Sequence, residues 1–493
     1  MKYVTVKAKN LQNYSNLSDI DWEKLAAGYK VASKKGAYKS SRPGCPQIPP
    51  SIQLRDYQRT AAQSWFRGRG RGTLKMATGS GKTITALAIA EELYQKIGLQ
   101  VLLVVCPYRH LVAQWGRECE KFNLQPILAM SSVYTWQSQL SGQLYNLRAL
   151  LQPFLTVITT NTTLIADSFQ SQIRFFPPKT LIIGDEAHNL GSPRLQDSLP
   201  RNIGLRLALS ATPERYLDEE GTDSLLNYFG PVLQPEFTMA DAIKQGALVP
   251  YLYYPLLVEL TSEESLTYSK LTKRIGWALN QSEESRNNEN LTSLLMQRSR
   301  LIGSAANKLE ALRQLMKERL HTSHTLFYCG DGYVESKSIY NRQLAAVTRI
   351  LGAELGYRVN TYTAETSLEE REEMRRQFES GELQGIVAIR CLDEGVDIPA
   401  IQNAVILAST GNPRQFIQRR GRILRPYPGK ERATLFDTIV MPPELDRHTW
   451  EVERNLLKRE LKRLIEFADL ADNANSARSK LLSLQKKYQL LGL

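Results

Sequence analysis

Residues Thr73–Leu93 read TLKMATGSGKTITALAIAEEL, a short apolar segment followed by a loop of small residues and a helical pattern. The loop glycines, Gly79 and Gly81, let backbone N–H groups approach an anion without a Cβ in the way. The positive end of the following helix adds to the attraction for a phosphate group. A strand, a phosphate-binding loop and a helix in this order indicate an α/β domain with a parallel sheet.

The polar side chains of this loop suit a nucleoside triphosphate and its magnesium ion. Lys82 can reach the β- and γ-phosphates, and Thr83 can ligate Mg²⁺. Met76 stands where the P-loop pattern has its first glycine, so a glycine-rich turn that only packs is the alternative. The predicted phosphate-binding residues are Thr78, Gly79, Ser80, Gly81, Lys82 and Thr83.

A second segment, TLIIGDEAHNL (Thr180–Leu190), is an apolar run that leads into two adjacent carboxylates. Adjacent carboxylates at a strand end point in different directions, so one can serve a metal ion and the other an attacking water. We predict that Asp185 holds Mg²⁺ and that Glu186 polarises the water. An exposed acidic turn is the alternative, which the upstream Lys82 disfavours.

Short apolar runs alternate with helical stretches in two separate series. The first contains VLLVVCP, FLTVITT, TLIIGDE and LRLALSATP, and the second contains HTLFYCG, GIVAIRCLDEGVDIP, NAVILAST and ATLFDTIV. Such runs are typical of parallel strands covered on both faces. Leucines at helical spacing lie between the series, and the proline-rich SRPGCPQIPP precedes the first. The predicted parts are an N-terminal extension and linker (1–50), a first lobe (51–255), a linking strand and helical insertion (256–320), a second lobe (321–442) and a helical tail (443–493).

The tail has one apolar stripe at helical spacing. Leu457, Leu461, Leu464 and Phe467 fall on the same side of the helix that NLLKRELKRLIEFADL predicts. We expect this stripe to pack on the second lobe. A coiled coil with a partner is the alternative.

Composition and charge limit the class of protein. The 493 residues exceed one ordinary core, and 42% hydrophobic with 23% charged residues is typical of a soluble globular chain. Sixty-three basic against fifty acidic residues leave a net charge of +13, which suggests a polyanionic partner. Five scattered cysteines indicate a reducing compartment with no zinc site. The start, MKYVTVKAKN, lacks the apolar core of a signal peptide, and no apolar run reaches membrane-spanning length. We therefore expect a cytoplasmic protein without a membrane partner.

The segment FIQRRGRILR (Phe416–Arg425) contains four arginines. A basic run taken alone is more often a solvated or polyanion-facing surface. The other interpretation is a set of cations directed at one phosphoryl group, and the position of the segment along the chain decides between the two.

From about residue 51 to 440 the chain resembles superfamily 2 helicases and translocases of the DEAH-box type. LRDYQ (Leu54–Gln58) resembles the adenine-reading motif, and TLIIGDEAHNL carries the DEAH letters. CPYRHLVAQW, TTN, SATP, CLDEGVDIP and FIQRRGRILR resemble motifs Ia, Ib, III, V and VI, in the order of the family. The resemblance implies two tandem RecA-like lobes and a nucleic-acid-dependent ATPase that uses ATP and Mg²⁺. It also makes FIQRRGRILR mainly catalytic.

The resemblance implies further site residues. Arg55 and Gln58 would read the adenine, Gly395 and Asp397 would lie near the nucleotide, and Arg420 would be a surface residue. The implied catalytic residues are Lys82, Asp185, Glu186, Gln418, Arg422 and Arg425. Those that couple the nucleotide to the strand-binding face are His188, Ser210, Thr212 and Arg419. Those that contact nucleic acid are Pro107, Arg109, Gln114, Thr160, Asn161, Gly330 and Thr363.

The motif spellings favour DNA over RNA as the partner. QRRGRILR, DEAH and GVDIP look more like DNA-acting members, such as the XPB group and restriction-linked translocases, than like RNA-processing DEAD-box proteins. The segment DGYVESKSIYNRQ after LFYCG resembles helicase-like proteins of bacterial anti-phage systems, including phosphorothioate-DNA restriction. Three functions stay open: an ATP-driven DNA helicase or translocase in defence, restriction or repair; an RNA helicase; and a restriction nuclease or its motor subunit, with a nuclease or defence-complex partner.

Overall fold

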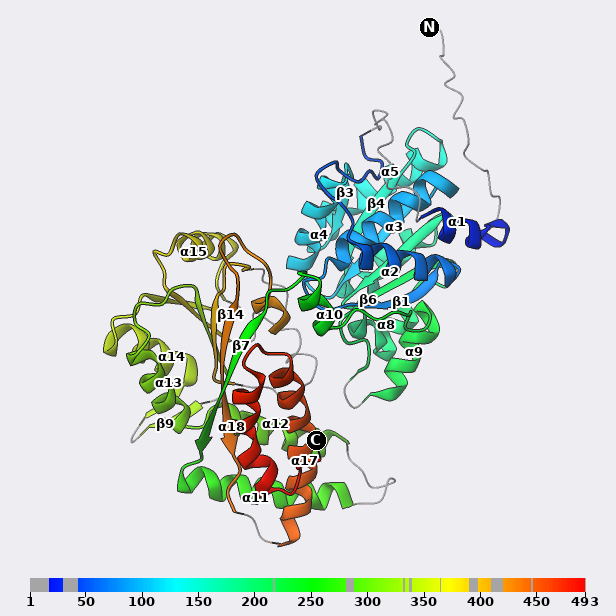
Figure 1. Cartoon of the computed structure of the whole chain (residues 1–493). Coiled ribbons are helices and arrows are strands. Elements are labelled where there is room, and N and C mark those ends of the chain that lie inside the picture. Colours follow the sequence, from blue (N-terminus) through cyan, green and yellow to red (C-terminus); the bar gives the residue numbers. More distant parts are fainter. Residues whose placement is uncertain are drawn as a thin grey trace. The chain divides into compact units, whose positions relative to one another are not determined.

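The structure is a computed structural model that describes most of the chain. The described residues are 17–29, 43–215, 218–280, 288–330, 333–336, 339–363, 365–389, 398–408, 420–444 and 447–492. They form two compact units that divide between Ala242 and Ile243, each with one six-stranded sheet (Figure 1). Neighbouring strands in both sheets run parallel. The predicted α/β fold with two parallel sheets is therefore confirmed.

The first sheet has the order β1-β6-β5-β2-β4-β3. Every residue of β2, β4, β5 and β6 is buried, because helices cover both faces of these strands. This is why their sequences read as continuous apolar runs without alternation. The strands are β1 (Arg71–Lys75), β2 (Val101–Cys106), β3 (Pro126–Ala129), β4 (Leu155–Thr160), β5 (Thr180–Asp185) and β6 (Leu205–Ser210).

Helices flank the first sheet on its two faces (Figure 1). On one face α2 contacts α3, and α3 contacts α4. On the other face Trp136, Phe169 and Phe229 share one core with Leu103 and Ile182 of the sheet. The helices of this unit are α2 (Asp56–Arg67), α3 (Lys82–Ile97), α4 (Arg109–Lys121), α5 (Gln137–Arg148), α6 (Asn161–Ile165), α7 (Asp167–Ile173), α8 (Pro193–Ser198) and α9 (Glu219–Phe229), with the short α10 (Met239–Lys244) at the division.

Part of the N-terminal extension belongs to the first unit. The helix α1 (Trp22–Gly28) packs on α2, where the rings of Trp22 and Trp65 are 6.3 Å apart, edge to face. Gln63 Nε2 donates a hydrogen bond to the carbonyl oxygen of Ala26 at 3.3 Å. Through these contacts α1 is part of the first unit.

The second sheet has the order β11-β12-β8-β13-β14-β7. Its edge strand β7 pairs with β14 over nine positions, from Tyr251 opposite Ala433 to Glu259 opposite Met441. The sequence had placed residues 251–255 in the first lobe, because prolines interrupt the pattern there. The strands are β7 (Tyr251–Glu259), β8 (Thr325–Cys329), β11 (Val359–Tyr362), β12 (Gly385–Ile389), β13 (Asn403–Ile406) and β14 (Ala433–Met441), and β9 (Tyr333–Ser336) and β10 (Ile339–Arg342) form a separate antiparallel pair.

The described residues between β7 and β8 are mostly helical, as predicted. The apolar stripe of the tail is also buried, and the ring of Phe467 stacks on Tyr251 of β7 at 4.4 Å. The expected packing of the tail on the second lobe is therefore confirmed. The helices of this unit are α11 (Ser262–Asn280), α12 (Asn288–Gly303), α13 (Asn307–Lys317), α14 (Gln343–Arg349), α15 (Leu368–Ser380), α17 (Arg447–Asp469) and α18 (Ala474–Lys487). Within the described ranges, no helix combines the length and the apolar character needed to cross a membrane.

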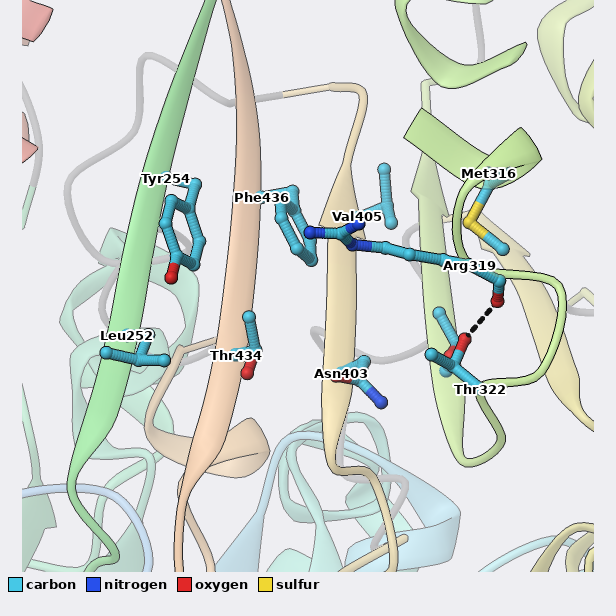
Figure 2. A pocket seen from close by; sticks show the side chains of 10 residues that line it. Leu252, Tyr254, Met316, Arg319, Thr322, Asn403, Val405, Thr434 and Phe436 are labelled. Carbon is cyan, nitrogen blue, oxygen red and sulfur yellow. Dashed lines mark hydrogen bonds between the residues drawn. The ribbon is translucent and has the colours of Figure 1, made fainter. Parts of the chain in front are cut away.

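A cavity of about 220 Å³ lies on one face of the second sheet (Figure 2). Tyr254 stacks on Phe436 there with ring centres 5.2 Å apart, and the guanidinium of Arg319 lies 5.0 Å from the Phe436 ring. Thr325 and Asn403, which also line the cavity, begin β8 and β13. The cavity is thus at the amino ends of the strands, whereas open parallel sheets bind ligands at the carboxyl ends. It is not the predicted nucleotide site.

Candidate active site

The predicted motifs of the first unit follow the carboxyl ends of its strands. The phosphate loop follows β1, SATP begins at the end of β6, and the DEAH letters begin at the end of β5. Because β1, β6 and β5 are neighbours, these three motifs lie side by side. Motifs Ia and Ib follow β2 and β4 in the other half of the sheet. The strand order therefore separates a nucleotide half from a half with the predicted nucleic-acid motifs.

The phosphate loop has the backbone that its glycines predict. Gly79 and Gly81 have φ angles of 86° and 82°, in the left-handed region that favours glycine. A Cβ at Gly81 would also lie only 2.5 Å from Nε2 of Gln58. Lys82 begins α3, and its Nζ donates hydrogen bonds to the carbonyl oxygens of Met76 at 3.2 Å and Ala77 at 3.5 Å. The ammonium group is therefore held against the residues that begin the loop.

Two hydroxyl groups of the loop test whether it fits a phosphate. Thr78 Oγ1 and Ser80 Oγ are buried, and neither has a hydrogen-bond partner among the described residues. A buried hydroxyl without a partner costs about 1–3 kcal/mol. A phosphate oxygen, or water in its place, would supply the missing bond, so the loop fits the predicted ligand. Thr83, in the first turn of α3, is half-buried.

The start of α2 holds the phosphate loop in place. The hydroxyl of Tyr57 donates to the carbonyl oxygen of Ser80 at 2.7 Å, and its ring stacks on Phe237 at 3.8 Å. Gln58 Nε2 donates to the carbonyl oxygen of Gly81 at 3.3 Å, and its Oε1 accepts from the backbone N–H of Arg55 at 2.9 Å. The amide group that was expected to read adenine is here engaged with the backbone. The side chain of Arg55 is exposed.

Asp185 ends β5 with both carboxylate oxygens in hydrogen bonds. Oδ2 accepts from the indole Nε1 of Trp115 at 2.8 Å, and Oδ1 accepts from the backbone N–H of Glu186 at 3.0 Å. Burial raises the pKa of the neighbouring Cys106 thiol, and the charge of Asp185 raises it further, so this thiol stays protonated. Sequence reasoning missed Trp115. No local pattern indicates this bond, because Trp115 and Asp185 lie 70 positions apart along the chain.

Glu186 has an unusual backbone. Its φ and ψ angles of 45° and 50° lie in the left-handed region, which is costly for a residue with a Cβ. Its Oε2 lies 3.6 Å from Nδ1 of His188. Backbone strain of this kind occurs at functional sites, where the surrounding structure maintains it. The turn directs the Glu186 and Asp185 carboxylates differently, as the predicted division of roles requires.

The predicted coupling residues of the first unit lie together. His188 Nδ1 is 3.3 Å from Ser210 Oγ, and the same hydroxyl oxygen accepts from the backbone N–H of Thr212 at 3.1 Å. Two residues that sequence reasoning missed hold the histidine. Asn189 Nδ2 is 3.0 Å from His188 Nε2, and Arg215 donates to the His188 carbonyl oxygen. The ends of β5 and β6 are thus linked through one imidazole.

The predicted nucleic-acid residues of motifs Ia and Ib differ in availability. Arg109 is exposed at the start of α4, and Pro107 and Gln114 are half-buried. Thr160 caps α6, because its Oγ1 accepts from the backbone N–H of Thr163 at 3.1 Å. Asn161 Oδ1 is buried with no partner in the described residues. The Arg109 side chain is therefore open to solvent and Asn161 has a buried acceptor that lacks a donor in the described part of the chain, whereas Thr160 has a structural role.

In the second unit, two predicted nucleic-acid residues also follow strand ends. The backbone N–H of Gly330, after β8, donates to Gln343 Oε1 at 2.7 Å. The carbonyl oxygen of Thr363, after β11, accepts from Arg371 at 3.1 Å. Both residues are half-buried at the carboxyl edge of the second sheet. Gly395, Asp397, Gln418 and Arg419 lie outside the described residues.

The arginine segment is described from Arg420 onward. Arg422 and Arg425 are half-buried. Arg420 is only 1% exposed, forms an ion pair with Asp437 of β14, and lies 4.8 Å from the ring of Phe467. The prediction of Arg420 as a surface residue was wrong. Its partners come from distant parts of the chain, so local charge gave no sign of them.

Comparison with known proteins agrees with the motifs. Residues 51–215 match the family model described as "Type III restriction enzyme, res subunit", and residues 307–427 match "Helicase conserved C-terminal domain". The first segment lies within the predicted first lobe, and the second covers most of the predicted second lobe together with the last residues of the predicted insertion.

Curated relatives include two proteins named for action on DNA. The chain is 29% identical over 412 residues to "DNA 3'-5' translocase XPB2" of Sulfurisphaera tokodaii, with 80% of this chain and 83% of that protein covered. It is 27% identical over 400 residues to "DNA 3'-5' helicase XPB" of Mycobacterium tuberculosis, with 80% and 62% covered.

A solved structure supports the fold. The enzyme titled "ATP-dependent Type ISP restriction-modification enzyme LlaBIII bound to DNA" superposes with a TM-score of 0.55 at 20% identity, over 85% of this chain and 30% of that one.

Two matched family segments cover more than half of the chain and contain the motifs in family order. The chain belongs to the superfamily 2 helicases, with a restriction-type first lobe and a helicase C-terminal second lobe.

Proposed function

We propose that this protein is a DNA-stimulated ATPase that moves along DNA in the 3'–5' direction. One observation carries the ATPase part: the phosphate loop, the Asp185–Glu186 turn and the His188–Ser210 pair lie on three adjacent strand ends. The choice of DNA and of direction rests on the relatives, whose names state both. The excess of basic residues supports a polyanionic track.

The residues of the first unit divide the chemistry. Lys82 would bind the β- and γ-phosphates, and the loop hydroxyls would complete the cradle. Thr83 and Asp185 would hold Mg²⁺, which when bound neutralises charge on the phosphates. Glu186 would accept a proton from the attacking water, in an orientation that its left-handed turn maintains. The Trp115 indole donates to Oδ2 of Asp185 and so restrains the carboxylate that would hold the ion.

His188 would transmit the state of the nucleotide. One ring nitrogen, Nδ1, lies 3.6 Å from Glu186 Oε2 and 3.3 Å from Ser210 Oγ. A change at the γ-phosphate that moves Glu186 therefore reaches SATP through one side chain. By family resemblance we assign Arg422 and Arg425 to the charge that develops on the transferred phosphoryl group, where such residues contribute about 10³ to 10⁵ in rate.

The helical insertion offers a surface for nucleic acid. Leu266, Lys270, Lys273, Arg274 and Trp277 are exposed on α11, and their spacing places them on one side of the helix. We call this set the α11 face. Trp277 is 70% exposed, which is rare for the largest aromatic residue. Cations beside an exposed indole are the combination that tracks a strand and stacks its bases.

A second candidate function is the motor subunit of a restriction or defence complex. The match of residues 51–215 to a restriction subunit model favours it. This function adds a nuclease partner to the same motor, so it changes the assembly and leaves the ATPase chemistry as proposed. Affinity purification of the chain from its native cells, followed by a nuclease assay of the co-purified material, separates a lone motor from a subunit.

ATP turnover with different nucleic acids tests the main proposal. We expect single-stranded or duplex DNA to raise turnover well above RNA, and displacement of a third strand from a triplex to show 3'–5' movement. Stimulation by RNA alone would overturn the choice of DNA.

The chemistry has its own test. Lys82→Ala and Glu186→Gln should each lower ATP turnover at least about 100-fold, because each removes a group from the reacting centre. Glu186→Gln should still bind ATP, since the phosphate cradle is intact. Full turnover in either variant would contradict the assigned roles.

A further inference from the structure

Lys430 is a buried cation that the proposed chemistry does not use. It is 7% exposed, five residues after Arg425. Burial and, to a smaller extent, the neighbouring charge of Arg425 lower the pKa of Lys430 to about 7. A lysine in such a place needs compensation by specific partners.

The ammonium group of Lys430 has three donors, and the structure supplies three backbone carbonyl acceptors. Nζ donates to Ile423 at 2.5 Å, to Arg425 at 2.9 Å and to Pro399 at 3.2 Å. Ile423 and Arg425 belong to FIQRRGRILR, and Pro399 is the last residue of CLDEGVDIP. One side chain thus joins the ends of motifs V and VI.

The other end of the arginine segment is fixed as well. Arg420 forms a buried ion pair with Asp437, which also accepts from the Tyr253 hydroxyl at 3.0 Å. Between the two anchors, the Leu424 carbonyl oxygen accepts from the backbone N–H of Val249 at 2.8 Å. The backbone that carries Arg422 and Arg425 is therefore held at its start, at its middle and at its end.

We propose that Lys430 is a positioning residue that fixes the directions of Arg422 and Arg425 by fastening their backbone to the end of motif V. This inference rests on the proposed function, in which those two arginines act on the phosphoryl group. Lys430 lies outside the motifs, and all three of its hydrogen bonds within the described part of the chain go to carbonyl oxygens. A misplacement of about 1 Å in a charged group of this kind can cost about 100-fold in rate.

The test compares full-length variants by steady-state ATP turnover with saturating DNA. Lys430→Met keeps the length and apolar stem but removes the donors. We expect kcat to fall about 10- to 100-fold while KM for ATP changes less than about threefold, because the phosphate cradle of the first unit is unchanged. Lys430→Arg retains a cation with several donors and should recover part of the loss. Arg432→Met is the matched control, because the Arg432 side chain is 53% exposed and forms an ion pair with Asp472 at the surface.

A double-mutant cycle separates positioning from general stability. Lys430→Met should add little to the loss in kcat when Arg422 and Arg425 are already alanine, because it acts through them. An undiminished further loss in that background, or unchanged kcat in the single variant, would overturn the inference. If Lys430→Met does not fold, the same cycle with Lys430→Gln decides. If Lys82→Ala and Arg422→Ala leave turnover intact, the proposed function fails. If both lower turnover while Lys430→Met leaves kcat unchanged, only this inference fails.

Discussion

At the scale of single residues, the candidate site depends on buried partners that hold its charged groups. Asp185 has one oxygen bonded to Trp115 and the other to its own backbone neighbour. The indole reaches Asp185 from α4, whose buried face also carries Leu111, Val112 and Cys119. Packing of α4 therefore sets the orientation of a residue assigned to the metal.

Trp115→Phe tests this link. The change keeps an aromatic ring but leaves Asp185 Oδ2 without its donor, so the carboxylate can rotate. We expect ATP turnover to fall about tenfold, equivalent to about 1.4 kcal/mol, with a raised requirement for Mg²⁺. Trp136→Phe is the control, because Trp136 is equally buried and its Nε1 has no acceptor among the described residues. Equal losses in both variants would mean that only packing was disturbed.

Lys308 makes stability depend on pH. It is fully buried and donates to the Leu407 carbonyl oxygen at 2.5 Å, and burial lowers the pKa of Lys308 to about 8. Between pH 8 and the unfolded value near 10.5, the unfolded state binds more protons, so stability rises with pH. Over this window the rise is up to about 3 kcal/mol.

The measurement is chemical denaturation of the second unit between pH 7.5 and 10. We expect the stability gained by Lys308→Met relative to wild type to be largest at the low end of this range and to shrink as the pH rises. Lys317→Met, at the exposed end of the same helix, should show no such trend. A pH-independent difference for Lys308→Met would show that its pKa is not lowered.

At the scale of elements, the edge strand β7 is protected along its length. Asn473 donates to the Tyr253 carbonyl oxygen at 2.9 Å and accepts from the Tyr253 N–H at 2.8 Å, as a neighbouring strand would. Pro255 has no N–H to leave open, and Asn307 donates to the Glu259 carbonyl oxygen at 2.8 Å. An edge closed in this way resists pairing with another chain.

Asn473→Ala should lower the free energy of unfolding by about 1–3 kcal/mol, because two backbone groups of β7 lose their partner. Thermal unfolding measures the loss, and light scattering measures any new association through the exposed edge. Asn307→Ala removes a single, exposed bond and should cost less. A smaller effect at Asn473 than at Asn307 would contradict the assigned role.

The insertion and the tail form one helical layer around a buried ion pair. Arg298 of α12 contacts Glu453 and Glu460 of α17 at 3.0 and 2.9 Å, and Tyr268 of α11 donates to Glu453 at 2.5 Å. Removal of one member leaves an uncompensated buried charge. The α11 face is thus presented by a helix that two other helices hold.

At the scale of the whole molecule, the sequence predicted what depends on local order and missed what depends on long-range pairing. Both parallel sheets follow from continuous apolar runs, and the phosphate loop from its glycines. The pairing of β7 with β14 joins residues about 180 positions apart along the chain, and no local pattern in a proline-interrupted strand indicates it. The burial of Arg420 and the bond from Trp115 to Asp185 were missed for the same reason.

The net charge of +13 makes the whole chain attractive to nucleic acid, so the contribution of the α11 face must be separated from it. The dependence of DNA binding on salt separates the two, because the loss of one cation that contacts a phosphate lowers the slope of log K against log salt by about 0.7 to 0.9.

We expect Lys270→Gln with Arg274→Gln to lower the slope for single-stranded DNA by about one to two. Trp277→Ala should weaken binding by about 1–3 kcal/mol at every salt concentration, because stacking is not screened. Arg375→Gln with Arg376→Gln removes the same charge from α15, where glutamates pair with both arginines at 2.7 Å, and should leave the slope unchanged. Equal slopes for the two double variants would mean that only overall charge attracts the DNA and that α11 is not a contact surface.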